Sequence, residues 1–164
     1  MRNLECGVKR VLTIEERFMM EALKEAEKAF EKDEVPVGAV IVHEGKIIAR
    51  AHNQNVMLKD PTAHAEMVAI TEAASALQSE RLLKADLYVT IEPCAMCAGA
   101  LVLARIQRVV FGAKDLKAGA CGSVMNIAHN RNLNHRISIT GGILESDCRR
   151  LLQEFFKRKR LKEN

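Results

Sequence analysis

The chain has 164 residues, of which 48% are hydrophobic and 28% are charged, and its formal net charge is +4. This length fits one domain with a sizeable core, and the composition excludes a disordered chain. No apolar run approaches the roughly 18 residues that a membrane-spanning helix needs. The first residues, "MRNLECGVKR", lack the apolar stretch of a signal peptide. We therefore expect a cytoplasmic protein without membrane contact.

The N-terminal part of the sequence predicts an extension, a helix and a hairpin. Residues 1–12 show no periodicity, and we expect a disordered extension there, followed by a single domain over residues 13–164. The motif "TIEE" at Thr13 is a capping box, so an amphipathic helix should start there and run to about residue 34. Residues 35–53 form two β-rich runs on either side of Glu44-Gly45, which predicts a hairpin.

Beyond residue 60, helical and extended segments alternate along the chain. In order, we expect a helix from Pro61-Thr62 to about Leu77, a strand over 85–91, a helix over 94–104, a strand over 108–112, a glycine-rich loop over 113–123, a strand over 135–140 and a helix over 144–160. This alternation predicts an α/β fold. We expect a three-layer sandwich in which helices flank a mixed central sheet of about five strands.

Two cysteines at the start of the predicted helix over 94–104 point to a metal. Cys94 and Cys97 are three residues apart, so their sulfurs share one face of the helix. Both follow Pro93 in the first turn, where the positive end of the helix dipole favours thiolates. Two neighbouring thiolates form half of a zinc site, and His64, at the start of another helix, could supply a third ligand. The odd total of five cysteines does not suggest a disulfide framework.

Glu66, in the motif "HAE", gives this site a chemical task. One histidine and two cysteines leave the fourth tetrahedral position of zinc open for water, as in catalytic zinc sites. Two residues along a helix separate side chains by roughly 200°, so Glu66 is poorly placed to bind the same metal as His64. At a frayed first turn it can instead lie beside that water and act as a general base and then as a general acid.

Two other interpretations of these residues stay open. A C-x-x-C unit that opens a helix is also the thioredoxin pattern, although redox chemistry leaves "HAE" unexplained. A closed structural zinc site would need a fourth ligand, and none of the candidates has a convincing spacing: His43, His52, Cys121, His129, His135 and Cys148.

"HAE" followed by "PCAMC" resembles the zinc-dependent nucleobase deaminases, in which the histidine and cysteines hold zinc and the glutamate moves protons. The segments "EVPVGAV", "DPTAHAE", "LYVTIEPCAMCAGAL", "RVVFGAKD", "NHR" and "FFKRKR" extend the resemblance over about residues 13–160 to the bacterial tRNA-specific adenosine deaminases. The resemblance implies a cytidine deaminase-like fold, one Zn²⁺ per chain and a homodimer. It also implies hydrolytic conversion of the wobble adenosine in the anticodon loop of arginine tRNA to inosine. The start "MRNLECGVKR" departs from the family pattern.

The same resemblance assigns four substrate contacts. Asn53 and Ala65 would lie against the target base, whereas Asp115 and Asn134 would contact nucleotides of the anticodon loop. Without the resemblance, Asn53 is an ordinary turn residue, and Asp115 and Asn134 are polar loop residues.

The C-terminal end carries the net charge of the chain. Residues 157–164 hold five basic and one acidic side chain, whereas the rest of the chain has twenty of each sign. A basic end on a neutral body suggests contact with a polyanion, here the tRNA anticodon stem-loop, although basic residues also complement the dipole at a helix end. Phe155 and Phe156 could stack on bases or belong to the core. The proposed RNA-binding tail consists of Lys157, Arg158, Lys159 and Arg160.

Two alternative functions remain. The metal motif is shared with deaminases of free guanine, cytosine or nucleotides, and the basic tail favours RNA over these. A zinc-stabilised RNA-binding module without catalysis is the other, and Glu66 argues against it, because a structural site has no use for an acid that does not bind the metal.

Overall fold

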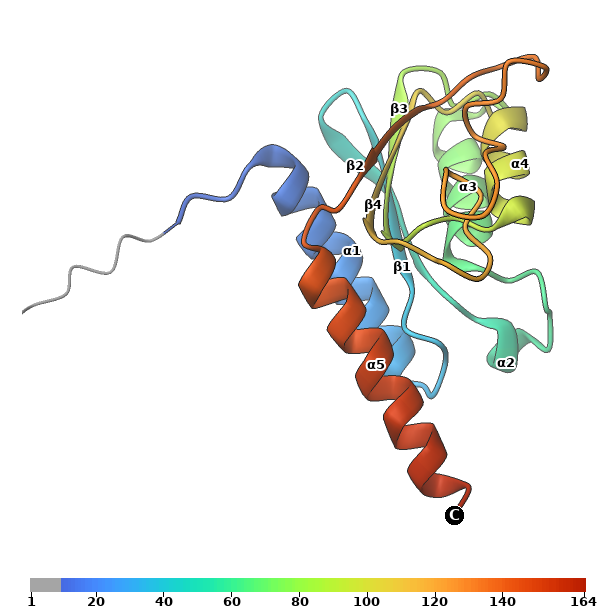
Figure 1. Ribbon diagram of the computed structural model, residues 1–164. Coiled ribbons are helices and arrows are strands. Elements are labelled where there is room, and N and C mark those ends of the chain that lie inside the picture. The colour runs from blue at the N-terminus through green and yellow to red at the C-terminus, as the bar shows by residue number, and fades with distance from the viewer. Residues whose placement is uncertain (1–9) are drawn as a thin grey trace, which may run out of the picture.

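The computed structural model describes residues 10–164 (Figure 1). In chain order the elements are α1 (Ile14–Glu31), β1 (Gly38–His43), β2 (Lys46–His52), α2 (Asn55–Leu58), α3 (Ala65–Leu77), β3 (Ala85–Ile91), α4 (Ala95–Leu103), β4 (Arg108–Ala113), β5 (Ser138–Gly141) and α5 (Glu145–Lys162). The first nine residues of the predicted disordered extension lie outside the described part of the chain.

The strands form one mixed sheet in the order β2-β1-β3-β4-β5. β1 is antiparallel to β2 and β3, whereas β3, β4 and β5 run parallel to one another. The turn between β1 and β2 has positive φ angles at Glu44 and Gly45, which is the backbone that a two-residue hairpin loop requires. The predicted α/β class and the number of strands are confirmed.

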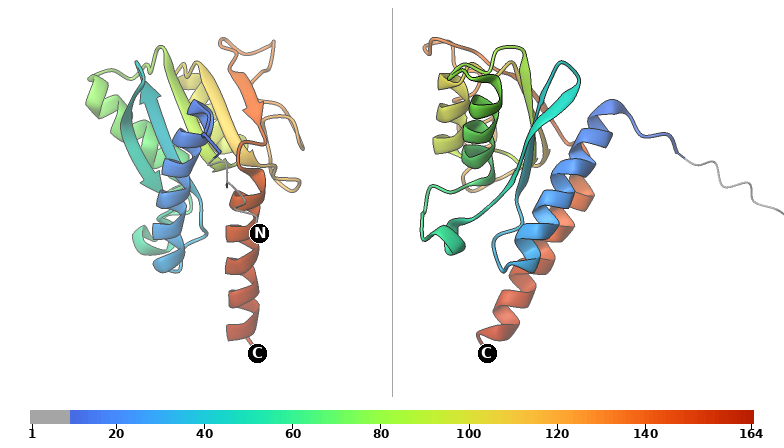
Figure 2. Two further views of the ribbon diagram at one scale, coloured as in Figure 1. Left: turned by 90° about the vertical axis from the view of Figure 1, so that its left-hand side faces the viewer. Right: turned by 180° about the vertical axis from the view of Figure 1, so that it is seen from behind.

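Helices cover both faces of the sheet (Figures 1 and 2). α1 and α5 lie side by side on one face, and α3 and α4 lie on the other. Along β1, Ala39 and Ile41 join the core under α3 and α4, while Val40 and Val42 join the core under α1 and α5. Because successive side chains of a strand point to opposite faces, a strand buried on both faces needs the continuous apolar run seen here.

The first helix starts and packs as its sequence dictates. The Thr13 hydroxyl accepts a hydrogen bond from the Glu16 N–H at 3.1 Å, and the Glu16 carboxylate accepts one from the Thr13 N–H at 3.0 Å, so the predicted capping box is present. α1 then lies directly on the start of β1. A Cβ atom at Gly38 would come within 1.9 Å of the Ala22 carbonyl oxygen. Only glycine fits at this position of "EVPVGAV".

The four-residue helix α2 was not predicted. The buried carboxylate of Glu34, in the segment between α1 and β1, accepts hydrogen bonds from the N–H groups of Val56 (3.1 Å) and Met57 (2.7 Å). These bonds satisfy the free donors at the start of the helix. The residue that holds α2 is thus more than twenty positions away, where local patterning gives no signal.

Two other boundaries differ from the predictions. α3 begins at Ala65 and not at Pro61-Thr62, because the Asp60 carboxylate accepts hydrogen bonds from both the N–H (2.8 Å) and the hydroxyl (2.7 Å) of Thr62 and makes a turn there. β5 begins three residues later than expected, because the Ile137 N–H bonds outside the sheet, to the Ala128 carbonyl at 2.8 Å.

The last helix reaches beyond the rest of the fold. α5 runs along α1 and continues past the end of the sheet, toward the same end of the molecule as the N-terminal ends of α3 and α4 (Figures 1 and 2). Among residues 10–164, no helix is both long and apolar enough to cross a membrane.

Candidate metal centre

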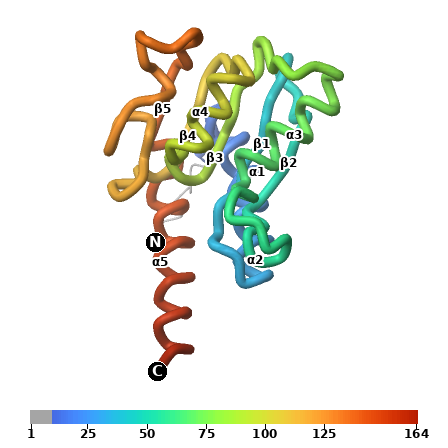
Figure 3. The backbone as a smooth tube through the Cα atoms, turned by 90° about the vertical axis from the view of Figure 1, so that its right-hand side faces the viewer, coloured from blue at the N-terminus to red at the C-terminus, as the bar shows by residue number. Residues whose placement is uncertain are grey.

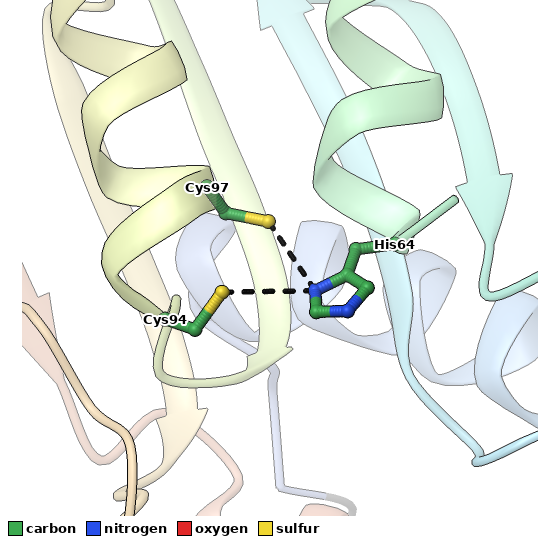
Figure 4. A group of neighbouring side chains, drawn as sticks. All are labelled: His64, Cys94 and Cys97. Carbon is green, nitrogen blue, oxygen red and sulfur yellow. Dashed lines mark hydrogen bonds between the residues drawn. The ribbon is translucent and has the colours of Figure 1, made fainter. Parts of the chain in front are cut away.

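His64, Cys94 and Cys97 come together between the N-terminal ends of α3 and α4. The His64 Nδ1 atom lies 3.7 Å from the Cys94 sulfur and 3.5 Å from the Cys97 sulfur, with both sulfurs on the same side of the ring (Figure 4). Within residues 10–164 this is the one group of three metal-ligating side chains whose donor atoms lie close enough to share an ion. None of the six candidate fourth ligands belongs to the group, which disfavours the closed structural site.

The distances fit zinc. Bonds of about 2.3 Å to sulfur and about 2.0 Å to nitrogen, at a tetrahedral angle, place the two donor atoms about 3.5 Å apart. The observed separations of 3.5 and 3.7 Å match that edge length. The two cysteines and the histidine therefore lie where three corners of a tetrahedral site would be.

Two of these side chains occupy the N-cap positions of their helices. His64 precedes α3 and Cys94 precedes α4, both with extended backbone, and neither side chain caps a helix N–H. Cys97 is the third residue of α4 and lies in its first turn. Because His64 lies before the helix and not within it, the angular separation that would keep Glu66 apart does not apply. No fraying of α3 is needed to bring both side chains to one site.

The two thiols have opposite acidities. Hydrogen bonds from the Cys97 thiol and from His64 lower the pKa of Cys94 to about 3. The hydrogen bond to Cys94, together with burial, raises the pKa of Cys97 far above its usual value. The protein alone thus stabilises one thiolate at this place. A bound cation would favour ionisation of the second thiol, because metal binding releases protons from cysteine ligands.

Glu66 lies in the first turn of α3 and is 3% exposed. Burial raises its pKa to about 7. A carboxylate that exchanges a proton near neutral pH, next to a metal group, is suited to general acid–base chemistry.

Asn53 follows β2 and caps α3 from outside the helix. Its side-chain oxygen accepts a hydrogen bond from the Ala65 N–H at 2.8 Å, and both residues are buried. This bond replaces the cap that His64 does not provide. It also fixes the amide so that the side-chain nitrogen remains as a donor, whereas the Ala65 N–H is already used. Asn53 is thus bound to the residue that directly follows His64, and the predicted contact of Asn53 and Ala65 with the substrate stays a prediction.

Asp115 lies in the glycine-rich loop after β4, which runs beside α4 (Figure 3). Its side chain accepts hydrogen bonds from the N–H groups of Lys117 (3.0 Å) and Ala118 (3.1 Å), which shapes the loop. The loop contacts the segment that carries the two cysteines, because the Ala120 N–H donates to the carbonyl of Pro93, directly before Cys94, at 2.8 Å. Asp115 is therefore held near the metal group.

Asn134 lies at the opposite end of α4. Together with Leu133 it lines a small cavity next to Leu103 and Arg105, at the C-terminal end of this helix. α4 has nine residues, so about 13 Å of helix separates this cavity from the cysteines at its start. The structure does not bring Asn134 to the metal group of its own chain.

The proposed RNA-binding tail is partly engaged within the protein. Arg158 and Lys159 form ion pairs with Asp33, at 3.3 and 2.7 Å, and the Arg158 guanidinium lies over the Phe30 ring. Phe155 is buried against the same ring, while Phe156 is exposed. Of the four predicted tail residues, Lys157 and Arg160 are exposed, whereas Arg158 and Lys159 are half-buried.

Glu92 is a site residue that the sequence reasoning missed. This buried carboxylate lies two positions before Cys94 and accepts hydrogen bonds from three backbone N–H groups of the glycine-rich loop. Burial alone would raise the pKa of Glu92, but these bonds and one from Ser123 keep it below its usual value. The available signal was an acid that directly follows a mostly apolar strand.

Comparisons with known proteins agree with this site. Residues 12–113 match the family model described as the cytidine and deoxycytidylate deaminase zinc-binding region. The chain is 51% identical to the tRNA-specific adenosine deaminase of Bacillus subtilis, over 93% of this chain and 94% of that protein. It is 54% identical to the tRNA-specific adenosine deaminase of Aquifex aeolicus, over 88% and 95%.

Solved structures show the same relationship. A structure from a study of A-to-I editing by tRNA:A34 deaminases superposes with a TM-score of 0.80 and 47% identity, covering 83% of this chain and 99% of that one. A guanine deaminase from Nitrosomonas europaea superposes with a TM-score of 0.76 and 26% identity, covering 89% and 86%. The chain therefore belongs to the deaminases with a cytidine and deoxycytidylate deaminase zinc-binding region, in the family of the tRNA-specific adenosine deaminases.

Proposed function

We propose that this protein is a zinc-dependent enzyme that deaminates the wobble adenosine of a tRNA anticodon loop to inosine. The observation that carries the proposal is a buried glutamate, Glu66, beside a group of three side chains that could hold a metal ion. The similarity to tRNA-specific adenosine deaminases over nearly the whole chain supports the substrate. By the family resemblance, we infer that the tRNA is an arginine tRNA and that the enzyme acts in the cytoplasm.

His64, Cys94 and Cys97 would hold the zinc ion. Zinc bound there supplies the Lewis acidity that makes a water molecule nucleophilic at neutral pH. Glu66 would accept a proton from the attacking water and donate it to the purine ring nitrogen, and it would then accept the proton of the new C6 hydroxyl and donate it to the leaving amine. A bond from oxygen to C6 forms, the bond from C6 to the amino nitrogen breaks, and ammonia leaves. Water supplies every added atom, so no redox partner is needed.

The remaining predicted contacts would orient the RNA. The Asn53 amide, held by Ala65, presents its nitrogen as a donor to the target base. Asp115 would act from the adjoining loop, and Lys157 and Arg160 would meet phosphates with their exposed side chains. An anticodon loop suits this site, because its bases are unpaired and can leave the stack at low cost.

We further propose a symmetric homodimer with α4 at its interface. All nine residues of α4 are apolar or glycine, which is typical of a helix buried on every side. Its outer side is uncovered in the single chain, where Leu103 is 79% exposed and Met96 is also exposed. A two-fold interface uses the same patch on both copies, and an uncharged helix face meets this requirement without unpaired charges.

A two-fold arrangement would also give Asn134 a role. It lies at the end of α4 away from its own metal group, so in an antiparallel pairing of two α4 helices it would approach the metal group of the second copy. This supports the predicted contact of Asn134 with the anticodon loop as one made across the dimer.

A free-base deaminase is the second candidate, because the similarity to the guanine deaminase from Nitrosomonas europaea extends over 89% of the chain. The zinc-loaded protein should therefore be incubated in parallel with a wobble-adenosine stem-loop of arginine tRNA, with the same stem-loop carrying guanosine at that position, and with free adenosine, guanine and cytosine. Mass spectrometry should show inosine in the first sample alone. Rapid turnover of guanine or cytosine with an unmodified stem-loop would establish the second candidate instead.

A further inference from the structure

Glu92 connects the segment that carries Cys94 and Cys97 to the glycine-rich loop after β4, which lies more than twenty residues further along the chain. It is 2% exposed and lies between β3 and Cys94. Its two carboxylate oxygens accept hydrogen bonds from the N–H groups of Asp115 (3.1 Å), Cys121 (3.0 Å) and Ser123 (3.0 Å), and from the Ser123 hydroxyl. Backbone groups of a loop without regular structure thus depend on one side chain for their hydrogen bonds.

The loop is clamped at its base and free at its tip. At the base of the loop, Gly119 pairs with Cys94. A Cβ atom at Gly119 would lie 2.5 Å from the Glu92 carboxylate, so only glycine fits at this position. Residues 119–121 are buried. The preceding residues 114–118, here called the tip, are exposed apart from the half-buried Asp115 and carry two basic side chains, Lys114 and Lys117.

The hydrogen bonds form a continuous chain from the base of the loop to its tip. Glu92 binds the N–H of Asp115, and the Asp115 carboxylate in turn accepts from the N–H groups of Lys117 and Ala118. Glu92 therefore sets the conformation of the tip at Lys117 through Asp115, and Lys114 directly precedes the residue whose N–H Glu92 binds. Cys94 and Cys97 belong to the start of α4 and face His64, and Cys94 meets the loop through its backbone bridge to Gly119, in which the Glu92 carboxylate takes no part.

We infer that Glu92 is a positioning residue for RNA capture: through Asp115 it holds the Lys114–Lys117 tip beside the metal centre, where the two lysines meet phosphates of the bound loop. The inference rests on the proposed function. Glu92 acts on substrate binding and not on proton transfer, because its oxygens are occupied by the loop and it makes no hydrogen bond to His64, Cys94 or Cys97 within the described residues.

The first test is the substitution Glu92→Gln, which keeps the size of the side chain but turns one acceptor into a donor that faces N–H groups. We expect normal zinc content, kcat within about twofold of the wild type, and a KM for the stem-loop about tenfold higher, as for the loss of a hydrogen bond to a charged group. Glu16→Gln is the matched control. Glu16 is also a buried acceptor of a backbone N–H, but on α1, on the other face of the sheet. The substitution Glu16→Gln should lower the melting temperature without changing the KM for the stem-loop.

The second test distinguishes positioning from a general loss of structure. In a chain that carries Lys114→Gln and Lys117→Gln, the substitution Glu92→Gln should change KM by less than about twofold, because the side chains that it positions are gone. An unchanged KM in the single variant, an equal rise in KM in both backgrounds, or a fall in zinc content with kcat would each overturn the inference.

A milder variant covers the case in which Glu92→Gln does not fold. Ser123→Ala removes one donor from the same carboxylate and should raise KM about threefold, again only when the two lysines are present. An additive effect in the lysine-free background would contradict the inference. Failure of the wild-type protein to deaminate the stem-loop would refute the proposed function. If the wild type deaminates the stem-loop and Glu92→Gln leaves KM unchanged, this inference alone is refuted.

Discussion

His64 and Cys94 each stand at the N-cap of a helix, and each directs its side chain to the metal group instead of to a helix N–H. A polar N-cap side chain usually contributes about 1 kcal/mol to a helix. For α3 the loss is offset by Asn53, whose oxygen accepts the Ala65 N–H. The residues that form the site therefore replace ordinary helix capping with metal binding.

The ligand assignment predicts a difference between neighbouring cysteines. Cys94→Ala should reduce zinc from one ion per chain to nearly none, because two ligands do not retain the metal. Cys121→Ala should keep its zinc, because Cys121 lies outside the ligand group and burial raises the pKa of its thiol to about 12. Elemental analysis of the two purified variants checks this. Full zinc in Cys94→Ala would disprove the assignment.

The role of Glu66 predicts that metal binding and activity separate. Glu66→Gln should retain zinc and lose activity by roughly 10²–10⁴-fold, which is the usual contribution of a general acid–base group. Glu72→Gln, at an exposed position of the same helix, is the matched control and should keep both. The measurement is single-turnover inosine formation with zinc-loaded protein. Wild-type turnover in Glu66→Gln would exclude the proton transfer.

At the scale of elements, α4 combines two functions in nine residues. Its first turn carries the cysteines, its inner side packs with Ala98, Leu101 and Val102 buried, and its outer side is apolar and uncovered. The chemistry of the site and the proposed dimer contact thus belong to the same short helix. A substitution that disturbs the dimer contact is therefore expected to affect the metal site through α4, and the reverse.

The proposed interface makes a prediction for Leu103. Leu103→Asp should raise the dissociation constant of the dimer by at least about tenfold, because a charge would be buried between two apolar faces. Ile14→Asp is the control, since Ile14 is also an exposed apolar residue but lies on α1, across the sheet. Sedimentation velocity over a range of concentrations measures both. A wild-type chain that stays monomeric would count against the dimer itself.

Local sequence patterns predicted most elements, because their causes are local. The capping box starts α1, the Glu44-Gly45 turn joins β1 to β2, and the strand over 85–91 is found where it was expected. α2 escaped prediction because its N–H groups are satisfied by Glu34, far away in sequence.

The site could be predicted to a similar extent. The spacing of Cys94 and Cys97 predicted two metal ligands on one helix face with His64 as a third, and the structure places the three side chains together. Glu92 carries no motif, because its role depends on a loop that folds back over twenty residues later. The pairing of Arg158 and Lys159 with Asp33 depends on the packing of α5 against α1, which no local pattern shows.

At the scale of the whole molecule, the metal site and the basic tail belong to one end of the protein. The N-terminal ends of α3 and α4 and the C-terminal end of α5 point the same way, on opposite faces of the sheet (Figure 1). A bound stem-loop could therefore meet both. Asp33 neutralises part of the tail, which limits the positive charge that faces a phosphate backbone.

This arrangement predicts that the tail residues are not equivalent. The variant with Lys157→Gln and Arg160→Gln should weaken stem-loop binding and reduce the slope of log K against log salt by about one unit per lost contact. The variant with Arg158→Gln and Lys159→Gln should change the slope less and lower the thermal stability, because these side chains bind Asp33. Zinc content should be unchanged in both. Equal salt slopes in the two variants would contradict the distinction.

The placement of the ligands on two helices has a consequence for the order of folding. The short segment Cys94–Cys97 offers only two ligands, and His64 is separated from it by α3 and by β3, which lies between β1 and β4 in the folded sheet. An unfolded chain therefore has no local loop that could capture zinc, unlike a peptide in which all ligands are close in sequence. The ion should enter after the central strands have paired. Its uptake rate during refolding would then report the formation of tertiary structure.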